Sequence, residues 1–534
     1  MLRLLFICLL LPTTPGLAGP LAERICALLQ QPLPHTGSKP AAVVRRVYRQ
    51  QKCRPMWIRH GRLTTRAEQI LDVLRGAPLD GLDPGAYGVP WIRSRPAGGR
   101  LAATELAISQ GLYDWSRDVA YGRAAPAARR PDLFFYPPPA TTDFAGLVQN
   151  VRQAGDLRAW LGRRAPAHRF YAGLRRALER LRRLEADGGW PLVRRSLRPG
   201  DRHPAVRRLQ RRLFLAGDYR HPDPGSGRFH PLLKKAVQGF QRRHGLHADG
   251  VVGRRTLAAL DVTVQERMAA VALNMERWRW LRRDPGNDHV MINLASYRLQ
   301  LVQKRRPVLD MRVVVGGPGR HSPVFSGRIN RIEFNPVWHI PRSIILEDYA
   351  AALRGPGAAA WLRRRGIRIY AGPGARALEL PVAGLVREGR DLTREGLWFR
   401  QDPGPMNPLG MVKFMFPNPF AVYLHDTNDR PAFRRADRAG SHGCIRLQRP
   451  GELATLLLNG DGERRTEAGL RRLAREHGGP LSFSLKKPVP VHLTYQTAWV
   501  DDADRLHFRA DVYGRDRILQ DLLRPARAAV HAAR

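Results

Sequence analysis

The chain has 534 residues and a formal net charge of +44, because 90 lysines and arginines outnumber 46 acidic residues. This length is too great for one hydrophobic core and, at about 100–200 residues per domain, predicts three or four domains. The basic excess favours a polyanionic partner, which could be nucleic acid, a membrane surface or the cell wall. No zinc finger, RNA-binding signature or basic stripe interleaved with aromatic residues accompanies it, which argues against the nucleic-acid classes.

The N-terminal segment has the features of an export signal. Arg3 precedes a short apolar run at 4–11, and Gly16 and Ala18 are small residues at the positions that precede a cleavage site. The run is far shorter than the roughly 20 residues that a membrane-spanning helix needs, and no later segment qualifies. We therefore expect a signal peptide at 1–18 and a periplasmic mature chain with no transmembrane segment and no nucleic-acid partner.

Residues 20–195 follow a helical period that is interrupted by turns rich in proline and glycine. Within 170–190, for example, Leu174, Leu178 and Leu181 recur at the spacing that places them on one face of a helix. This part of the chain has no catalytic motif. We expect a helical N-terminal scaffold domain here.

The number of cysteines suggests that one of them is unpaired. Removal of the signal peptide leaves Cys26, Cys53 and Cys444, an odd number for a chain in an oxidising compartment. Cys26 and Cys53 lie in the same segment and could pair, but the sequence leaves this open. In either case Cys444 stands apart, and a spare thiol is best explained by a chemical use.

A small helical bundle is expected at 201–262. Two helices each carry an apolar stripe, and the glycines of 249–253 suit a tight turn before a short third helix. The pattern closely resembles the type 1 peptidoglycan-binding module, which implies binding to the cell wall. The matching residues, most of which have core or turn character, are Leu209, Gln210, Ala236, Val237, Phe240, Gln241, Gly245, Leu246, Asp249, Gly250, Gly253, Thr256 and Leu260.

Beyond a connecting helix at 263–286, the apolar period changes from 3.6 to 2. Apolar residues alternate through 290–315, which is typical of half-buried strands. We expect a β-rich domain at 287–500, with a glycine-rich insertion at about 346–412 that forms a lid or a substrate wall. The remaining residues, 501–534, are expected to form a C-terminal tail.

Histidine and cysteine come together in the β-rich domain. His425 ends the alternating strand pattern "FAVYLHD", and Cys444 follows Gly443 in "SHGC". A neighbouring imidazole is expected to raise the thiolate fraction of Cys444 and later to protonate a leaving amine. The backbone N–H groups of Gly443 and Cys444 could face a developing oxyanion. These residues favour a Cys/His acyl transferase.

Two other chemistries compete with this interpretation. Zinc is the stronger rival, because His425, Asp426, His442 and Cys444 are all of ligand type. The metal-binding spacings CxxC and HExxH are absent, however, and His442 and Cys444 stand only two residues apart. The other alternative is a serine acyl transferase. Its only support is an SxxK pair at 484–487, and the SDN and KTG motifs that accompany such a pair elsewhere are missing.

The stretches "YLHDT" and "SHGCIRL" resemble the catalytic motif of the YkuD-type L,D-transpeptidases. The likeness extends to 323–344, 408–420 and 489–502, and to the N-terminal "LDGLDPGAYGVP", which are similar to large Gram-negative members with a peptidoglycan-binding domain. The resemblance implies an α+β multidomain chain: a helical N-terminal region, a three-helix module and a β-sandwich-like catalytic domain with a capping insertion. It implies neither a cofactor nor a metal.

The resemblance also implies catalytic roles by motif position. Cys444 would be the nucleophile and His425 the general base. His442 and Gly443, together with Ser441, would shape the site around the thiol and the oxyanion.

For substrate binding, the resemblance implies that Tyr423 lines the donor pocket and that Arg446 holds a loop or meets a substrate carboxylate. Ser441 and Asp426 are further candidates at the site. Asp426 stands where the short family members have glycine, so whether it orients His425 through its side chain or its carbonyl stays open.

The implied reaction is cleavage before the terminal D-alanine of a tetrapeptide stem, followed by transfer to the amine of a second stem, which forms a 3-3 cross-link. The implied partners are the peptidoglycan sacculus, its stem peptides and other cell wall synthases. Water or a lipoprotein amine as acceptor, or an inactive wall-binding scaffold, are the alternatives. The sequence ranks none of the acceptors and does not indicate an oligomeric state.

Overall fold

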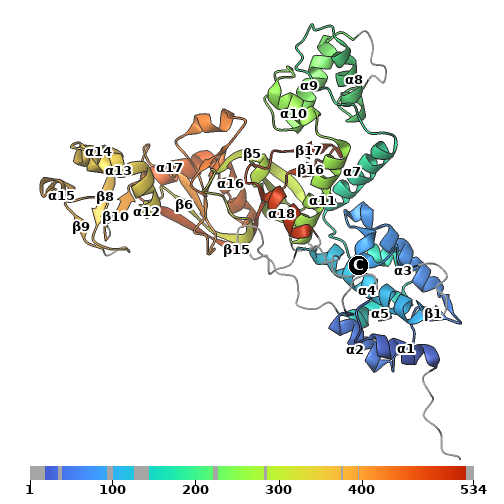
Figure 1. Cartoon of the computed structure of the whole chain (residues 1–534). Coiled ribbons are helices and arrows are strands. Elements are labelled where there is room, and N and C mark those ends of the chain that lie inside the picture. The colour runs from blue at the N-terminus through green and yellow to red at the C-terminus, as the bar shows by residue number, and fades with distance from the viewer. Residues whose placement is uncertain are drawn as a thin grey trace, which may run out of the picture. The chain divides into compact units, whose positions relative to one another are not determined.

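The computed structural model describes residues 19–33, 39–92, 100–124, 143–220, 227–281, 285–374, 377–394 and 396–524. The expected signal peptide therefore lies outside the described residues. The chain divides into two compact units, which we describe one at a time (Figure 1). The first is formed by residues up to 125 with 138–182 and 271–279, and the second by 126–137, 183–270 and 280–534. No described helix is long and apolar enough to cross a membrane.

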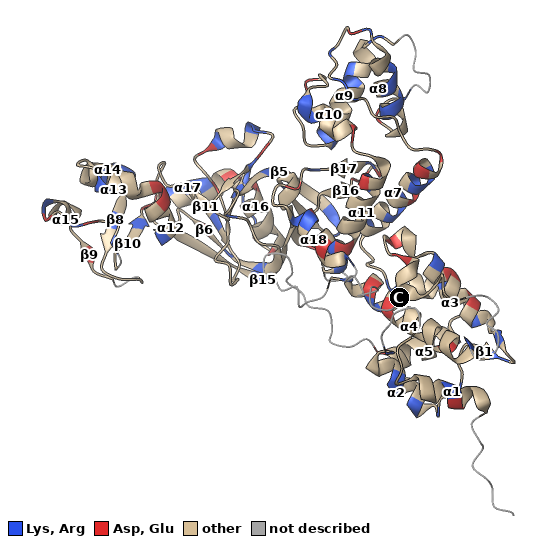
Figure 2. Cartoon of the chain, in the orientation of Figure 1, with Lys and Arg blue, Asp and Glu red and all other residues tan. Residues whose placement is uncertain are grey.

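Arginine and lysine are distributed over the elements of both units rather than gathered on one of them (Figure 2). Acidic side chains lie among them in both units. Among the described residues, the basic side chains are therefore not confined to one element.

The first unit is helical, as predicted for the N-terminal region. Its elements are α1 (Pro20–Leu28), α2 (Ala42–Gln50), β1 (Ile58–Arg59), β2 (Arg62–Leu63), α3 (Thr65–Arg75), α4 (Leu101–Tyr121), α5 (Phe144–Gln153), α6 (Leu157–Gly162), most of α7 (Arg169–Ala186) and the end of α11 (Val264–Arg279). Helix α4 is buried on nearly all sides, which is typical of the central helix of a helical domain.

Glu105 of α4 fixes the loop that follows α2. Its carboxylate accepts hydrogen bonds from the Tyr48 hydroxyl at 2.7 Å and from the N–H groups of Met56 and Trp57 at 2.6 and 3.0 Å. Burial raises the pKa of Glu105 to about 7. The buried carboxylate is thus satisfied by polar donors rather than by a charge, and its role is structural.

A disulfide joins Cys26 of α1 to Cys53, with the Cα atoms 5.5 Å apart. The pairing that the sequence left open is therefore present. Its sequence separation of 27 residues means that it restricts the unfolded chain, which stabilises the folded unit. Among the described cysteines, Cys444 is the free one.

The second unit begins with a three-helix module, as predicted. Its helices are α8 (Pro204–Leu215), α9 (Pro231–Arg243) and α10 (Arg254–Leu260). Their apolar stripes meet in one core that contains Leu209, Leu213, Val237, Phe240 and Leu260. The module therefore has a core of its own.

Gln241 explains several of the motif residues in this module. Its buried side-chain amide donates to Asp249 at 2.8 Å and to Thr256 at 3.1 Å, and its carbonyl accepts from the N–H of Gly250 at 2.8 Å. Gly250 has a φ of +79°, which favours glycine. These residues hold the turn between α9 and α10.

A nine-stranded sheet dominates the rest of the second unit, with the order β13-β5-β14-β12-β11-β6-β15-β3-β4. Strand β4 also pairs with β5, so the sheet closes on itself. Helices α16 (Pro450–Gly460) and α17 (Glu467–His477) pack on its core. The strands are β3 (His289–Asn293), β4 (Arg298–Gln303), β5 (Arg306–Gly316), β6 (Phe325–Phe334), β11 (Val412–Met415), β12 (Leu424–His425), β13 (Ala439–Ser441), β14 (Ile445–Leu447) and β15 (Leu481–Thr494).

The segment between β6 and β11, residues 335–411, is the capping insertion (yellow in Figure 1). It has a core of its own and a four-stranded sheet with the order β7-β10-β8-β9. It begins before the expected 346 because β7 follows β6 after a short turn. Its elements are β7 (Trp338–Ile340), α12 (Arg342–Ile344), α13 (Ala350–Arg354), α14 (Ala358–Arg365), β8 (Ile367–Tyr370), β9 (Glu379–Leu380), α15 (Val382–Arg387) and β10 (Trp398–Gln401).

The segment expected to be a C-terminal tail is ordered as far as residue 524. It contains β17 (Leu506–Phe508), which pairs with β16 (Ala498–Val500), and α18 (Arg515–Leu523). The Tyr513 hydroxyl donates to the carbonyl of Gly316 at 2.7 Å, and Arg515 donates to the carbonyl of Ser322 at 3.0 Å. These bonds fasten the segment to the loop that follows β5.

Candidate active site

Two neighbouring parallel strands bring His425 and Cys444 together. In the pairing of β12 with β14, Leu424 lies opposite Ile445 and His425 lies opposite Arg446. Leu424 and Ile445 are fully buried in the core, so the residues on either side of them point to the other face of the sheet. Cys444 and His425 therefore share that face, with His425 opposite Arg446 and thus two residues further along the pairing than Cys444.

The Cys444 thiol is half-buried. Its sulfur lies 4.0 Å from the carbonyl oxygen of Ala421, a residue with a φ of +53°. Burial raises the pKa of the thiol, while the backbone and hydroxyl of Tyr423 and the charge of Lys413 oppose part of that rise. The expectation of a larger thiolate fraction is therefore wrong for the resting site, where the neutral thiol is favoured.

His425 is almost completely buried, at 5% exposure. Burial, with a contribution from the charge of Arg446, lowers its pKa to about 3. Its Nδ1 lies 2.5 Å from the carbonyl oxygen of Asp426. Because that oxygen can only accept, a neutral ring bonded to it carries its proton on Nδ1, and the backbone carbonyl of Pro408 also acts on the ring. The imidazole is thus neutral and in the tautomer that can accept a proton.

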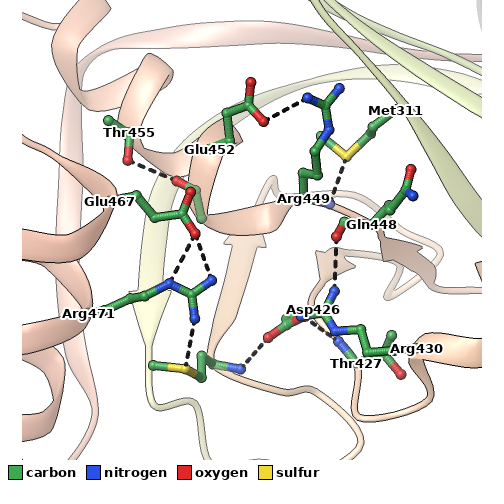
Figure 3. Close-up of polar contacts among 12 residues, drawn as sticks. Met311, Asp426, Thr427, Arg430, Gln448, Arg449, Glu452, Thr455, Glu467 and Arg471 are labelled. Carbon is green, nitrogen blue, oxygen red and sulfur yellow. Dashed lines mark hydrogen bonds and ion pairs between the residues drawn. The ribbon is translucent and has the colours of Figure 1, made fainter.

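Asp426 orients His425 through its carbonyl and not through its carboxylate. The carboxylate accepts from the N–H of Met411 at 2.8 Å and of Thr427 at 2.7 Å, and it pairs with Arg430 at 2.5 Å (Figure 3). Arg430 also donates to the carbonyl of Gln448, the residue after β14, at 2.9 Å. The Asp426 side chain and Arg430 thus link the end of β12 to the end of β14 through hydrogen bonds.

The turn before Cys444 is held by two hydroxyl groups. Ser441 accepts from the N–H of Gly443 at 3.2 Å and donates to the carbonyl of Cys444 at 2.5 Å, and Ser322 donates to the carbonyl of Gly443 at 2.6 Å. Gly443 has a φ of +110°, which requires glycine. In the resting site the Gly443 N–H is bonded to the Ser441 hydroxyl, so a developing oxyanion would have to replace that hydroxyl as its acceptor. The N–H of Cys444 donates to no acceptor among the described residues and remains a candidate.

His442 faces the capping insertion. Its Nε2 lies 3.0 Å from a carboxylate oxygen of Asp348, and Arg320 contacts the same nitrogen. Burial lowers the pKa of His442, while Asp348 opposes the shift. His442 thus connects the turn before Cys444 to the insertion, and its described contacts do not include the thiol.

The zinc alternative depended on His425, Asp426, His442 and Cys444 meeting at one point. In the described part of the chain, the group of metal-type ligands within mutual reach is instead Glu347, Asp348 and His442. Arg320 pairs with both of these carboxylates and contacts His442. The guanidinium already supplies the positive charge that a cation would bring to this cluster.

Tyr423 and Lys413 complete the face around the thiol. The Lys413 ammonium lies 4.3 Å from the centre of the Tyr423 ring, and Lys413 stands opposite His425 in the pairing of β11 with β12. Burial and the neighbouring Cys444 raise the pKa of the Tyr423 hydroxyl, and the Trp338 side chain of the insertion opposes this. Arg446 lies 3.5 Å from Asp429 and is near enough to lower the pKa of His425.

Sequence reasoning missed Lys413, Trp338 and Arg320. Lys413 stands between the buried Val412 and Phe414, so the alternation of that strand could have placed its side chain on the polar face. Trp338 and Arg320 carried no such signal, because both act through contacts between segments that are distant in sequence.

The buried thiol leads to a prediction on alkylation. Iodoacetamide reacts with the thiolate, so at pH 7 Cys444 is expected to react more slowly than a model thiol, with a rate that rises steadily with pH. The mature, unreduced protein should show one titratable thiol, since Cys26 and Cys53 are joined. Mass spectrometry after timed alkylation measures both quantities. A fast, pH-independent reaction at neutral pH would contradict the raised pKa.

Three family models match this chain. Residues 287–469 match the YkuD model, described as the L,D-transpeptidase catalytic domain. Residues 42–178 match the Scaffold domain, and 202–260 match the model described as "Putative peptidoglycan binding domain".

A curated protein of Haemophilus influenzae, named "Putative L,D-transpeptidase", is 29% identical over 247 residues, which is 46% of this chain and 48% of that protein. The chain thus matches about half the length of this relative. A solved L,D-transpeptidase of Xylanimonas cellulosilytica shares 17% identity over 57% of this chain and 99% of its own, with a TM-score of 0.18. One from Stackebrandtia nassauensis shares 14% identity over 56% and 94%, with a TM-score of 0.23.

Proposed function

This chain contains a YkuD L,D-transpeptidase catalytic domain and a peptidoglycan-binding domain, and we propose that it forms 3-3 cross-links between peptidoglycan stems. The observation that carries the proposal is the pairing of a free cysteine with a neutral, buried histidine on one face of the sheet. Cys444 supplies the nucleophile, and the tautomer of His425 fixed by Asp426 supplies the base.

In the first half-reaction, the Cys444 sulfur attacks the carbonyl carbon before the terminal D-alanine of a tetrapeptide stem. The thiol proton moves to the free nitrogen of His425, and the Cys444 N–H stabilises the oxyanion. The intermediate then collapses, and His425 returns the proton to the leaving amine of D-alanine. A thioester remains on Cys444.

In the second half-reaction, the side-chain amine of another stem attacks this thioester. His425 accepts the proton of the amine, the new amide forms, and the sulfur leaves and is protonated again. Because burial keeps the His425 imidazole neutral at physiological pH, the ring has no proton to lose first and can accept one in both halves. Tyr423 and Arg446 lie beside the thiol, where they would contact the donor stem.

We further propose that the chain is exported by its N-terminal segment and acts in the periplasm on the wall. The peptidoglycan-binding domain would hold the enzyme on the sacculus, its insoluble polymeric substrate. Water or a lipoprotein amine could replace the second stem in the same chemistry, and nothing in the site favours either of them.

Product analysis tests the proposal. The mature protein, incubated with tetrapeptide muropeptides, is expected to release D-alanine and to form dimers linked through their third residues, as identified by tandem mass spectrometry. Only monomeric tripeptides would indicate a hydrolase. Absence of both products, from protein shown to be folded, would overturn the enzymatic proposal.

The module at 202–260 leads to a separate prediction. Deletion of residues 201–262 is expected to reduce pelleting with insoluble sacculi severalfold, while soluble muropeptides still acylate Cys444. Circular dichroism should confirm that the remaining domains fold. If pelleting is unchanged and falls steeply with salt, the net charge rather than the module binds the wall.

A further inference from the structure

The capping insertion contains a cavity of about 480 Å³ whose lining includes His339, Arg342, Trp398 and Arg400. In β10, Phe399 is buried against the helices of the insertion. Trp398 and Arg400 therefore point to the opposite face of the small sheet. His339 of β7 lies directly opposite Arg400 in the strand pairing. The lining also includes Ile340, Ile345 and Phe399, so the cavity extends from this open face to the core of the insertion.

The arginines of the cavity have no acidic partner among the described residues. Arg342 donates to the backbone carbonyls of Thr393 and Arg394, the latter at 2.8 Å. Arg400 donates to a backbone carbonyl and lies over the ring of Tyr370, 4.0 Å from its centre. Neither guanidinium lies within ion-pair distance of a described carboxylate, although the charge of Arg342 acts on Asp391. A guanidinium favours a carboxylate as its partner.

Arg368 on the same sheet provides the contrast. It pairs with Glu379 at 3.3 Å and with Asp402 at 2.8 Å. Arg368, which stands opposite Arg400 in the pairing of β10 with β8, thus has two carboxylate partners, whereas Arg342 and Arg400 have none within ion-pair distance among the described residues.

Trp398 adds an apolar surface to this charged cavity. Its side chain is 49% exposed, which is unusual for a tryptophan. A flat aromatic surface beside two cations suits a ligand that has both carboxylates and an extended apolar or sugar-bearing part. An anionic peptide attached to a sugar has this composition.

The cavity lies close to the active site. Tyr423, the residue before β12, packs against the core of the insertion, to which Ile340 and Ile345 of the cavity lining belong. Lys413 in turn stands opposite His425 and over Tyr423. A peptide held in the cavity could therefore extend along Lys413 toward the acylated Cys444.

We propose that this cavity binds the acceptor stem peptide, with Arg342 and Arg400 holding its carboxylates and Trp398 packing against its body. This inference rests on the proposed function, because it names the site of the second substrate. Donor and acceptor then occupy different sites: the donor is bonded to Cys444 on the main sheet, and the acceptor lies on the insertion.

The test separates the two half-reactions. The double variant Arg342→Gln/Arg400→Gln is compared with Arg363→Gln/Arg364→Gln, which removes the same charge from two exposed positions on α14. The cavity variant should still form the acyl-enzyme, but at low acceptor concentration its transfer to an added tripeptide muropeptide should fall at least about tenfold. The control variant should transfer like the wild type. Intact-mass spectrometry measures the acyl-enzyme, and product analysis measures the dimers.

A binding measurement tests the acceptor cavity independently of the proposed transpeptidase activity. A tripeptide muropeptide lacks the D-alanine that the donor reaction releases, so its affinity for the wild type and both variants can be measured by calorimetry even if no acylation occurs. Weaker binding in the cavity variant alone supports the site. Equal affinity and equal transfer in all three proteins would overturn the inference and leave the transpeptidase proposal intact. Absence of acylation in the wild type would overturn that proposal, and binding would then decide the cavity alone.

Discussion

Replacement of Cys444 by alanine is expected to abolish both D-alanine release and cross-linking, with a loss of roughly 10⁴-fold or more. The methyl group cannot form the thioester, and the remaining oxyanion donor and binding contacts give only a small residual rate. Cys444→Ser should also be severely impaired, because a hydroxyl is far less acidic than a thiol and His425 must then remove a more tightly held proton. Mass spectrometry of muropeptide products measures these rates.

The control for this substitution is the unfolding temperature of both variants. Cys444 is half-buried, and its thiol contacts only the carbonyl of Ala421, at 4.0 Å, and the backbone and hydroxyl of Tyr423 among the described residues, so both variants should unfold near the wild-type temperature. The Cys26–Cys53 disulfide should persist in them. Cross-linking by a folded Cys444→Ala variant at more than about a thousandth of the wild-type rate would show that another group is the nucleophile.

Local sequence patterns indicated His425 and Cys444 as candidate site residues. The alternation of "FAVYLHD" places Tyr423 and His425 on one face of a strand, and a glycine before Cys444 allows the sharp turn that presents the thiol. Both features depend only on residues that are close in sequence. The helical first unit and the three-helix module were predictable for the same reason, because their periodicity is local.

The electrostatic state of the site was not predictable in this way. The raised pKa of Cys444 and the pKa of about 3 for His425 arise mainly from burial under segments that are distant in sequence. The use of the Gly443 N–H by Ser441 depends on the exact path of a turn. The carbonyl of Asp426 orients His425, while its carboxylate is bound by Met411, Thr427 and Arg430, and no spacing rule distinguishes these two roles.

The structure of the capping insertion also depends on contacts between segments that are distant in sequence, so local patterns did not predict it. Its glycine-rich sequence indicated an insertion, but its small sheet depends on the pairing of β7 with β10 across about 60 intervening residues. The cavity on its open face is formed by that pairing. Likewise, residues 501–534 were expected to form a tail, but as far as residue 524 they contain β17 and α18. Their order depends on long-range bonds such as that from Tyr513 to Gly316.

Replacement of His425 by alanine is expected to slow acylation by about 10²–10⁴-fold at pH 7 and to change its pH dependence. In the wild type the reactive state has a neutral thiol and a neutral imidazole. With a pKa of about 3 for His425 and a raised pKa for Cys444, this state is populated across pH 5–8. The wild-type kcat/KM for D-alanine release should therefore be nearly constant over that range.

In His425→Ala the reaction depends on the thiolate, because no base removes the proton. The thiolate fraction rises tenfold for each pH unit below the thiol pKa, so the rate of the variant should rise by roughly the same factor per unit between pH 5 and 8. Rate profiles for D-alanine release distinguish the two proteins. A wild-type rate that falls as the pH drops through 6.5 would show that His425 is charged in the free enzyme, contrary to its burial.

Stability provides a second measurement of the same group. The unfolded chain protonates His425 near pH 6.5, whereas the folded chain does so only near pH 3, so in this window the unfolded state binds more protons. The contribution of His425 to the free energy of unfolding is therefore greatest above pH 6.5 and is lost as the pH falls toward 3. Denaturant unfolding at pH 7 and pH 5 should show a larger loss on acidification in the wild type than in His425→Gln. Equal losses in the two proteins would mean that the imidazole is solvated. A solvated imidazole would be protonated in acid, and it could then not be the base that the flat rate profile requires.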